Sequence, residues 1–254
     1  VGAEKPFRDL GVGLASRGIA VLRYDKRTKV YGSKLVGLAQ FTVKDETIDD
    51  ALEAVKTARS QPGIDPERIF VLGHSLGGML IPRIAAGDSR LAGVIVMAGA
   101  ARPIEQAIVE QLRYLAMADG TISPDEQKAI DEASANAKTI EALTPADASS
   151  GRVILNAPAS YWLDLRGYDA PAAAKNVNQR MLILQGERDY QVTMNDFARW
   201  KTTLAGKSHV TFHSYPALNH LFISGTGKSL PAENETAGHV DAGVVGDIAD
   251  WIKK

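Results

Sequence analysis

The feature that most constrains this sequence is the stretch from Arg68 to Gly78, which reads Arg-Ile-Phe-Val-Leu-Gly-His-Ser-Leu-Gly-Gly. Its first half is a short apolar run, 69–72, typical of a buried strand, and an apolar helix is predicted over 79–86. Between them lies a Gly-x-Ser-x-Gly pattern, which places a serine at a sharp turn from a strand into a helix. The turn exposes the hydroxyl and aims a helix N-terminus at it, which favours developing negative charge. The pattern therefore predicts that Ser75 is a nucleophile.

The two glycines that flank the serine, Gly73 and Gly77, have an expected steric role. Side chains at either position are predicted to collide with the neighbouring strand and helix. A bare pattern of this kind also occurs in ordinary small-residue turns. The catalytic interpretation therefore depends on whether the rest of the chain supplies a general base and an orienting acid.

Buried strands and helices alternate through the first hundred residues, and the alternation returns near the end of the chain. The expected strands are 19–22, 69–72, 91–97, 180–184 and 210–215, with helices at 8–17, 43–60, 79–86, about 194–204 and 241–253 and a loop at 28–41. This order predicts an α/β fold with a doubly wound, mostly parallel sheet. Ligands of such sheets bind beyond the carboxyl ends of the strands, which is where Ser75 is expected.

The pattern changes in the middle of the chain. Residues 101–145 predict two helices and no strand, and the second begins at Ser123 with a capping box that includes Glu126. We expect residues 101–172 to form a helical cap inserted between two parts of the core, 1–100 and 173–254. Tyr161 and Trp162 are candidate substrate-pocket residues in this cap, although aromatic clusters are more often internal packing.

The base and the acid are sought near the strand ends that follow Ser75 in the chain. Glu187, Asp189 and Asp196 are the candidate acids, and Asp189 is favoured because it lies just past a strand end and beyond a glycine. His220 is the favoured base because it follows the last predicted strand by a short turn. The other histidines lie at 74, 209, 213 and 239, positions that do not suit a base at a strand end. Ser75, Asp189 and His220 thus fall in the order of a serine, acid and histidine triad.

Composition excludes several other functions. The net charge is −1, with 29 basic and 30 acidic residues well mixed, so nothing suggests nucleic-acid binding. No apolar run has the length of a membrane span, and the absence of cysteine removes thiolate metal sites and a cysteine nucleophile. The segment 225–229 resembles the end of a phosphate-binding loop, but Phe222 stands where the pattern needs glycine. The segment 119–126 resembles part of a calcium loop without its first ligands. No cofactor and no metal are expected.

Several segments resemble the α/β-hydrolase superfamily, and more narrowly the bacterial serine esterases related to dienelactone hydrolases. They are Lys5–Leu10, Arg17–Arg27, Gly73–Gly78, Leu184–Asp189 and Leu218–Phe222. The resemblance spans nearly the whole chain and implies hydrolysis of carboxylic esters through an acyl-serine intermediate. Dienelactone hydrolases themselves use a cysteine, which this chain lacks. Relatives are often exported, which slightly favours a secreted or periplasmic location, although no signal peptide is visible.

The resemblance also implies an oxyanion hole with two backbone N–H donors. One is the residue after the nucleophile, Leu76, and the other comes from a loop that such proteins place upstream of the segment resembling residues 2–7. The chain begins with Val1 rather than methionine, so we expect that donor, and the strand before it, to precede Val1. The alternatives are that another polypeptide supplies the donor or that the chain is a poor catalyst. Losing one such donor costs about 100- to 1000-fold in rate.

The leading hypothesis is a serine esterase for small or medium acyl groups, whose partner is a small-molecule ester. A peptidase or a thioesterase with the same triad is the second hypothesis. A non-catalytic binding module on a hydrolase scaffold is the third, and the unaccounted oxyanion donor is its only support. The sequence does not decide between acyl or alcohol groups and does not indicate an oligomeric state.

Overall fold

A computed structural model gives the structure of the chain and describes residues 3–36, 38 and 40–254. The chain forms two compact units. The first comprises Val1–Tyr24, Ala54–Ala101 and Ala170–Lys254, and the second comprises Asp25–Glu53 and Arg102–Asp169. The expected division into a core and a cap at 101–172 stays a prediction, and the second unit includes residues 25–53 as well.

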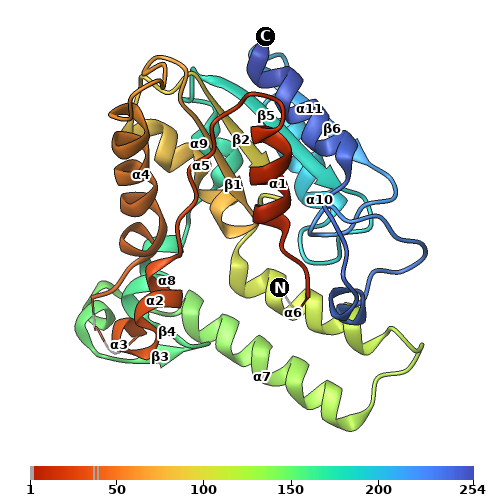
Figure 1. The fold of residues 1–254 in the computed structure, drawn as a ribbon. Helices are drawn as coiled ribbons and strands as arrows, with labels where there is room; N and C mark the ends of the chain where they lie inside the picture. Colours follow the sequence, from red (N-terminus) through yellow and green to blue (C-terminus); the bar gives the residue numbers. More distant parts are fainter. Residues whose placement is uncertain (1–2, 37, 39) are drawn as a thin grey trace. The chain divides into compact units, whose positions relative to one another are not determined.

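The first unit contains a parallel sheet with strands in the order β1-β2-β5-β6 (Figure 1). Their bounds are Phe70–His74, Gly93–Met97, Arg180–Gly186 and Val210–Tyr215. The central strands β2 and β5 are almost wholly buried. Strands buried on both faces are continuous apolar runs, and for this reason the sequence predicts them. The parallel α/β architecture predicted from the alternating pattern is confirmed.

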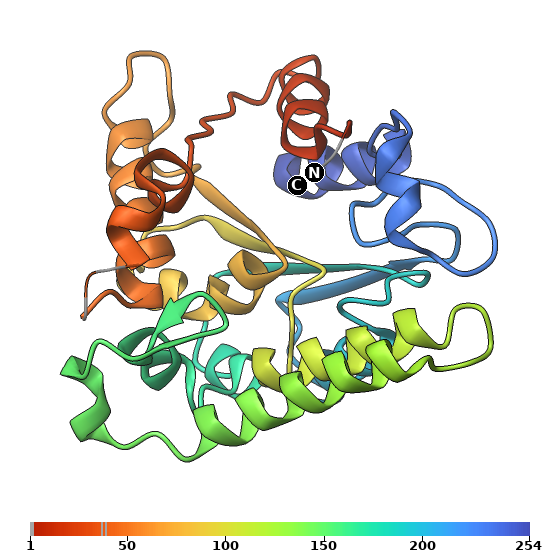
Figure 2. The same cartoon turned by 90° about the horizontal axis from the view of Figure 1, so that it is seen from below.

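Helices cover this sheet on both faces (Figure 2). On one face α1 (Pro6–Ala15) packs against α11 (Ala242–Lys253). On the other, α5 (Leu76–Gly87) packs against β1, β2 and the short helix α9 (Ala170–Ala174), and α10 (Met194–Thr203) contacts β5. The predicted helix starts and ends agree with the bounds of α1, α5, α10 and α11 to within a few residues, whereas α9 was not predicted.

The second unit contains the two helices predicted for the middle of the chain. These helices, α6 (Ile104–Ala116) and α7 (Pro124–Glu141), pack against each other, and the capping box between Ser123 and Glu126 forms as predicted. A two-stranded hairpin joins β3 (Val153–Ile154) to β4 (Ala157–Pro158) and leads into α8 (Ala159–Leu165). An apolar cluster holds these pieces together; its buried members are Ile140, Leu143, Ile154, Ala159 and Trp162.

The predicted loop at 28–41 contains two short helices, α2 (Arg27–Tyr31) and α3 (Ser33–Val36), so that prediction is wrong over those residues; positions 37 and 39 lie outside the described residues. The helix predicted over 43–60 begins as a π-helical turn, Lys44–Ile48, and continues as α4 (Asp49–Arg59). Two 3₁₀ turns, Pro145–Ser149 and Pro231–Glu235, complete the described elements.

The strand predicted over 19–22 does not form. These residues are irregular, and the side chains of Val21 and Leu22 are 38% and 43% exposed. A strand needs a hydrogen-bonded neighbour as well as an apolar sequence, and within the described part of the chain β1 is the edge strand of the sheet. The apolar side chains of β1 are accordingly only half-buried, whereas those of β2 are buried throughout. Apolar composition alone therefore gave the wrong prediction.

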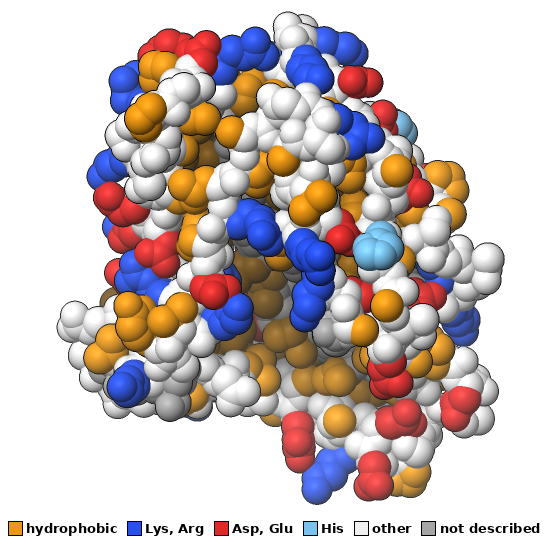
Figure 3. Space-filling view, in the orientation of Figure 1, with side chains coloured by type: hydrophobic (Ala, Val, Ile, Leu, Met, Phe, Trp, Pro, Cys, Tyr) orange, Lys and Arg blue, Asp and Glu red, His pale blue; other side chains and the backbone are white. Residues whose placement is uncertain are grey.

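The surface carries charges of both signs. On the face in Figure 3, acidic and basic side chains are interspersed with apolar ones, in keeping with the net charge of −1. Within the described residues, no helix combines the length and the apolar character needed to cross a membrane.

The elbow joins β1 to α5 through Ser75 in the first unit. The serine has φ 56° and ψ −120°, a strained conformation for a residue with a side chain. The Ser75 N–H donates to the Met97 carbonyl at 2.9 Å, and the Ser75 carbonyl accepts from the Met79 N–H at 2.9 Å. These bonds tie the turn to β2 on one side and to the first turn of α5 on the other.

Close packing at the elbow falls on Gly73, as expected, and on Gly78 rather than on Gly77. A Cβ atom at Gly73 would lie 2.3 Å from the Gly77 carbonyl oxygen, and one at Gly78 would lie 2.9 Å from the Gly99 Cα. A Cβ atom at Gly77 would meet nothing within 4 Å among the described residues, so the expected collision there is wrong. The reason is that Gly77 faces outward on the first turn of α5, where only its backbone takes part in the packing.

The two flanking glycines therefore give a matched pair of variants. We expect Gly73→Ala to lower the free energy of unfolding by at least about 2 kcal/mol, because its Cβ meets backbone rather than a movable side chain. Gly77→Ala is expected to change it by less than about 1 kcal/mol, since alanine suits a helix better than glycine. Urea denaturation of both variants measures this. Equal costs at the two positions would contradict the packing described.

Candidate active site

The three predicted catalytic residues all lie at the carboxyl end of the parallel sheet in the first unit. Ser75 follows the last residue of β1, Asp189 lies shortly after the end of β5, and His220 lies shortly after the end of β6. Because the strands are parallel, their carboxyl ends share one edge of the sheet. The fold thus brings residues from distant parts of the sequence to the same edge.

A hydrogen bond joins the predicted acid and the predicted base. The His220 Nδ1 atom lies 2.7 Å from Asp189 Oδ2, and both side chains are buried. Because a carboxylate oxygen can only accept, Nδ1 carries the proton in the neutral ring. That tautomer leaves the His220 Nε2 atom unprotonated and able to accept a proton, as a general base requires.

The Asp189 carboxylate is held by several donors. Its Oδ1 atom accepts from the Gln191 N–H at 2.8 Å and the Val192 N–H at 3.0 Å. Its Oδ2 atom accepts from Gln185 Nε2 at 3.2 Å in addition to His220. These bonds compensate for the loss of water around a buried carboxylate and fix its orientation toward the imidazole.

The loops that carry the acid and the base pack directly on each other at Gly186. A Cβ atom there would lie 2.5 Å from the Leu218 carbonyl oxygen, so the approach requires glycine. The Arg188 N–H donates to the same carbonyl at 3.0 Å, and the Glu187 N–H donates to the Tyr215 carbonyl at 2.9 Å. The position of Asp189 relative to His220 is therefore set first by backbone contacts.

His74 is a residue of this site that sequence reasoning set aside. Its Nε2 atom lies 2.8 Å from the His220 carbonyl oxygen, and the two rings have centroids 4.6 Å apart. A carbonyl only accepts, so Nε2–H of His74 donates and holds the backbone of His220 in place. Its place directly before the nucleophile was the only signal in the sequence, and the contact spans residues far apart in the chain.

The predicted nucleophile and the predicted oxyanion donor lie at the start of α5. Leu76 is the first residue of that helix, so its backbone N–H is one of those that an α-helix leaves without an intrahelical acceptor. Among the described residues, the Ser75 hydroxyl forms no hydrogen bond to the His220 imidazole. Such bonds are often long in structures without substrate and tighten when it binds. Gly2, in the segment tied to the second donor, lies outside the described residues.

The other candidate acids and histidines have different partners. Glu187 accepts from the Ser214 hydroxyl, and Asp196 accepts from the backbone N–H groups of Ala101 and Thr193 near the start of α10. His209 contacts the Val177 carbonyl, His213 lies 3.0 Å from Asp247, and His239 lies 3.2 Å from Asp9. None of these groups forms a hydrogen bond to His220 in the described part of the chain.

Tyr161 and Trp162 form hydrogen bonds within the second unit. The Tyr161 hydroxyl donates to Glu46 Oε2 at 2.6 Å, and the Trp162 Nε1–H donates to the Ile154 carbonyl at 2.8 Å. The Tyr161 ring stacks on Phe41, and Trp162 is a buried member of the apolar cluster. Internal packing therefore accounts for both aromatic residues, and a role in substrate binding stays a prediction.

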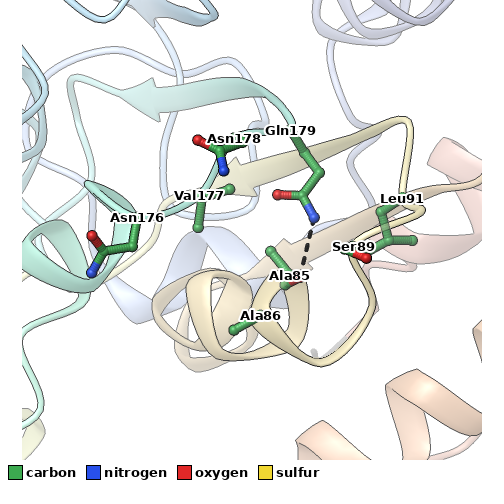
Figure 4. A pocket seen from close by; sticks show the side chains of 8 residues that line it. All are labelled: Ala85, Ala86, Ser89, Leu91, Asn176, Val177, Asn178 and Gln179. Atoms are coloured by element: carbon green, nitrogen blue, oxygen red, sulfur yellow. Dashed lines mark hydrogen bonds between the residues drawn. The ribbon is translucent and has the colours of Figure 1, made fainter.

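A pocket of about 470 Å³ lies at the other edge of the sheet in the first unit (Figure 4). Its lining residues lie at the end of α5 and just before β2 and β5; they are Ala85, Ala86, Ser89, Leu91, Asn176, Val177, Asn178 and Gln179. The Gln179 Nε2 atom donates to the Ala85 carbonyl at 3.1 Å and so ties the two sides together. Because it lies at the amino ends of the strands, this pocket is separate from Ser75. The described residues hold no cluster of His, Asp or Glu suited to a metal ion.

A serine at a strand-to-helix elbow, followed in the chain by an acid and a histidine at later strand ends, defines an α/β-hydrolase fold. The chain belongs to the prolyl oligopeptidase family, whose pattern it matches over residues 11–237. It is 41% identical over 254 residues to Esterase EstD of Thermotoga maritima. That alignment covers all of this chain but only 58% of the relative, so the chain spans a little over half of its length.

Solved structures support the same fold. An esterase of Pyrococcus furiosus superposes with a TM-score of 0.57 at 14% identity, covering 97% of this chain and 74% of that one. The esterase domain of a Rhodothermus marinus protein gives 0.54 at 14% identity, covering 97% and 79%. At such low identity these likenesses show the fold and nothing finer.

The environment of His74 leads to a pH-dependent stability. Burial, and then the neighbouring His220, lower the pKa of His74 from 6.5 to about 4. As the pH falls through 6.5 the unfolded chain takes up this proton before the folded chain does, so stability is lost between about pH 6.5 and pH 4. We expect this residue to contribute a loss on the order of 3 kcal/mol.

Chemical denaturation at a series of pH values measures this loss, and the comparison with His74→Gln isolates the contribution of His74 from that of the rest of the chain. The variant is expected to show a shallower decline of stability over the same pH range. An identical pH dependence in the variant and the unmodified chain would show that His74 is not held neutral in the folded state.

Proposed function

We propose that this chain is a serine hydrolase that cleaves carboxylic esters of small or medium acyl groups. The observation that carries the proposal is the buried hydrogen bond of 2.7 Å between His220 Nδ1 and Asp189, formed at the same sheet edge as the elbow serine. Esterase EstD, 41% identical over the whole of this chain, supports an ester substrate.

The roles of the residues follow from their chemistry. Ser75 Oγ attacks the ester carbonyl carbon while His220 Nε2 takes its proton, and the Asp189 carboxylate stabilises the resulting imidazolium. The Leu76 N–H donates to the oxyanion of the tetrahedral intermediate. When the intermediate collapses, the alcohol leaves with the proton from His220, and Ser75 remains acylated. Water then attacks the acyl group, His220 removes a proton from it, and Ser75 recovers that proton as the acid departs.

A peptidase with the same triad is the second candidate function. The match to the prolyl oligopeptidase family over residues 11–237 favours it. An amide is a harder substrate than an ester, because its amine leaving group must be protonated as the bond to carbon breaks. Matched ester and anilide substrates with the same acyl group and chromophore separate the two functions. Because the ester is the more reactive substrate for either enzyme, ester hydrolysis with no anilide hydrolysis above background supports the first proposal, and clear turnover of the anilide supports the second.

Ser75→Ala is the variant that tests the nucleophile. We expect the rate of hydrolysis of a short-chain chromogenic ester to fall at least about 1000-fold, because no other group of the site can form the acyl intermediate. Ser89→Ala, an exposed serine at the opposite edge of the same sheet, is the matched control and is expected to keep full activity. Circular dichroism and thermal melts of both variants confirm that the fold is intact. Activity retained in a folded Ser75→Ala variant would overturn the proposal.

A further inference from the structure

The segment resembling a phosphate-binding loop wraps a guanidinium group instead. Arg188 Nε donates to the Gly227 carbonyl at 2.9 Å, and Nη2 donates to the Thr226 carbonyl at 3.1 Å. A Cβ atom at Gly225 would lie 2.1 Å from Arg188 Nη1, so the loop passes directly against the guanidinium and a side chain there would displace it. The carbonyl oxygens of this loop point at a cation, and a phosphate would find no donors in their place.

Glu233 completes the enclosure of Arg188 and connects it to a second loop. Its Oε1 atom pairs with Arg188 Nη2. Its Oε2 atom accepts from Asn219 Nδ2 at 3.1 Å and from the Ser229 hydroxyl at 2.8 Å. One carboxylate thus bonds side chains from the segments after β5 and after β6.

The partners of Glu233 are the chain neighbours of the acid and the base. Arg188 directly precedes Asp189, and Asn219 directly precedes His220. Asn219 also fixes its own turn, because its Oδ1 atom accepts from the Leu221 N–H at 3.0 Å and the Ile223 N–H at 3.1 Å. Glu233 is therefore bonded to the chain neighbour of each partner in the Asp189–His220 hydrogen bond.

Arg188 and Glu233 compensate each other's charge. The Arg188 side chain is only 9% exposed, and a cation so buried needs a compensating anion. Burial alone would raise the pKa of Glu233, but the hydrogen bonds from Arg188, Asn219 and Ser229 outweigh it and lower that pKa, so the carboxylate stays ionised at neutral pH. Each oxygen of the Glu233 carboxylate therefore accepts from one of the two loops: Oε1 from Arg188, and Oε2 from Asn219 and Ser229.

We propose that Glu233 and Arg188 are positioning residues, which hold Asp189 and His220 at hydrogen-bonding distance by clamping the two loops that carry them. The catalytic consequence rests on the proposed function, whereas the geometric consequence does not. Glutamine at position 233 has one acceptor oxygen and an amide nitrogen that only donates. Either orientation of that amide places a donor against Arg188 or against Asn219, and so one of the two loops is released.

The experiment compares Glu233→Gln and Arg188→Lys with Glu235→Gln. Glu235 is exposed and lies on the same 3₁₀ turn, so its variant removes the same charge without touching the clamp. Steady-state kinetics with a short-chain ester measure kcat and KM for the intact chain. Independently, NMR follows the downfield resonance of the His220 Nδ1–H, assigned by its disappearance in His220→Gln.

We expect kcat to fall about 10- to 100-fold in Glu233→Gln and Arg188→Lys with KM changed by less than about 3-fold, because misplaced groups slow the chemical step rather than binding. The Nδ1–H resonance is expected to shift or to be lost by exchange with water in the same two variants. Glu235→Gln is expected to match the unmodified chain in both measurements. Lysine keeps the positive charge of Arg188 but lacks the planar guanidinium with its several N–H donors. A lower kcat in Arg188→Lys would therefore show that geometry matters as well as charge.

A purely structural role would lower the melting temperature of Glu233→Gln while leaving kcat of the folded protein and the Nδ1–H resonance unchanged, and that result would overturn the proposal. If the unmodified chain hydrolyses no ester, the proposed function fails by itself. The NMR comparison then still decides the clamp, because an unchanged resonance in both variants refutes it and a perturbed one supports it.

Discussion

The strained backbone at Ser75 is the constraint on which the rest of the site depends. A residue with φ 56° costs free energy, and here it is held by hydrogen bonds to Met97 on β2 and to Met79 in α5. The strand and helix can approach so closely only because Gly73 and Gly78 carry no side chain. The same geometry places Ser75 at the sheet edge beside the N–H of Leu76, so the strain and the proposed function have one structural cause.

The second half of the site is built by two loops that meet through several layers of contacts. Backbone contact at Gly186 brings the loops together, the Asp189–His220 bond joins their functional side chains, and the carboxylate of Glu233 bonds the residues next to each. His74 adds a contact from the elbow itself to the backbone of His220. Asp189 and His220 thus belong to one hydrogen-bonded assembly, which His74 ties to the elbow that carries Ser75.

The sheet strands could be predicted because runs such as 93–97 and 180–184 are apolar and bounded by turn residues. The start of the helix at 124–141 could be predicted from its capping box. The strand prediction for 19–22 was wrong because a strand also requires a hydrogen-bonded neighbouring strand, which composition does not reveal. Asp189 and His220 could be proposed from chain order, since parallel strands bring their carboxyl ends together. His74, Arg188 and Glu233 could not, because their contacts join distant segments and leave no local pattern. The roles of the site residues in catalysis remain proposals.

The central claim is that Ser75 is an activated nucleophile, and covalent labelling tests it most directly. The account predicts that a fluorophosphonate probe forms one adduct per chain, that mass spectrometry of the digested protein places the adduct on Ser75, and that His220→Gln slows labelling strongly while leaving the fold intact. An unlabelled chain, or a label on another residue, would contradict it and would favour a binding module on a hydrolase scaffold.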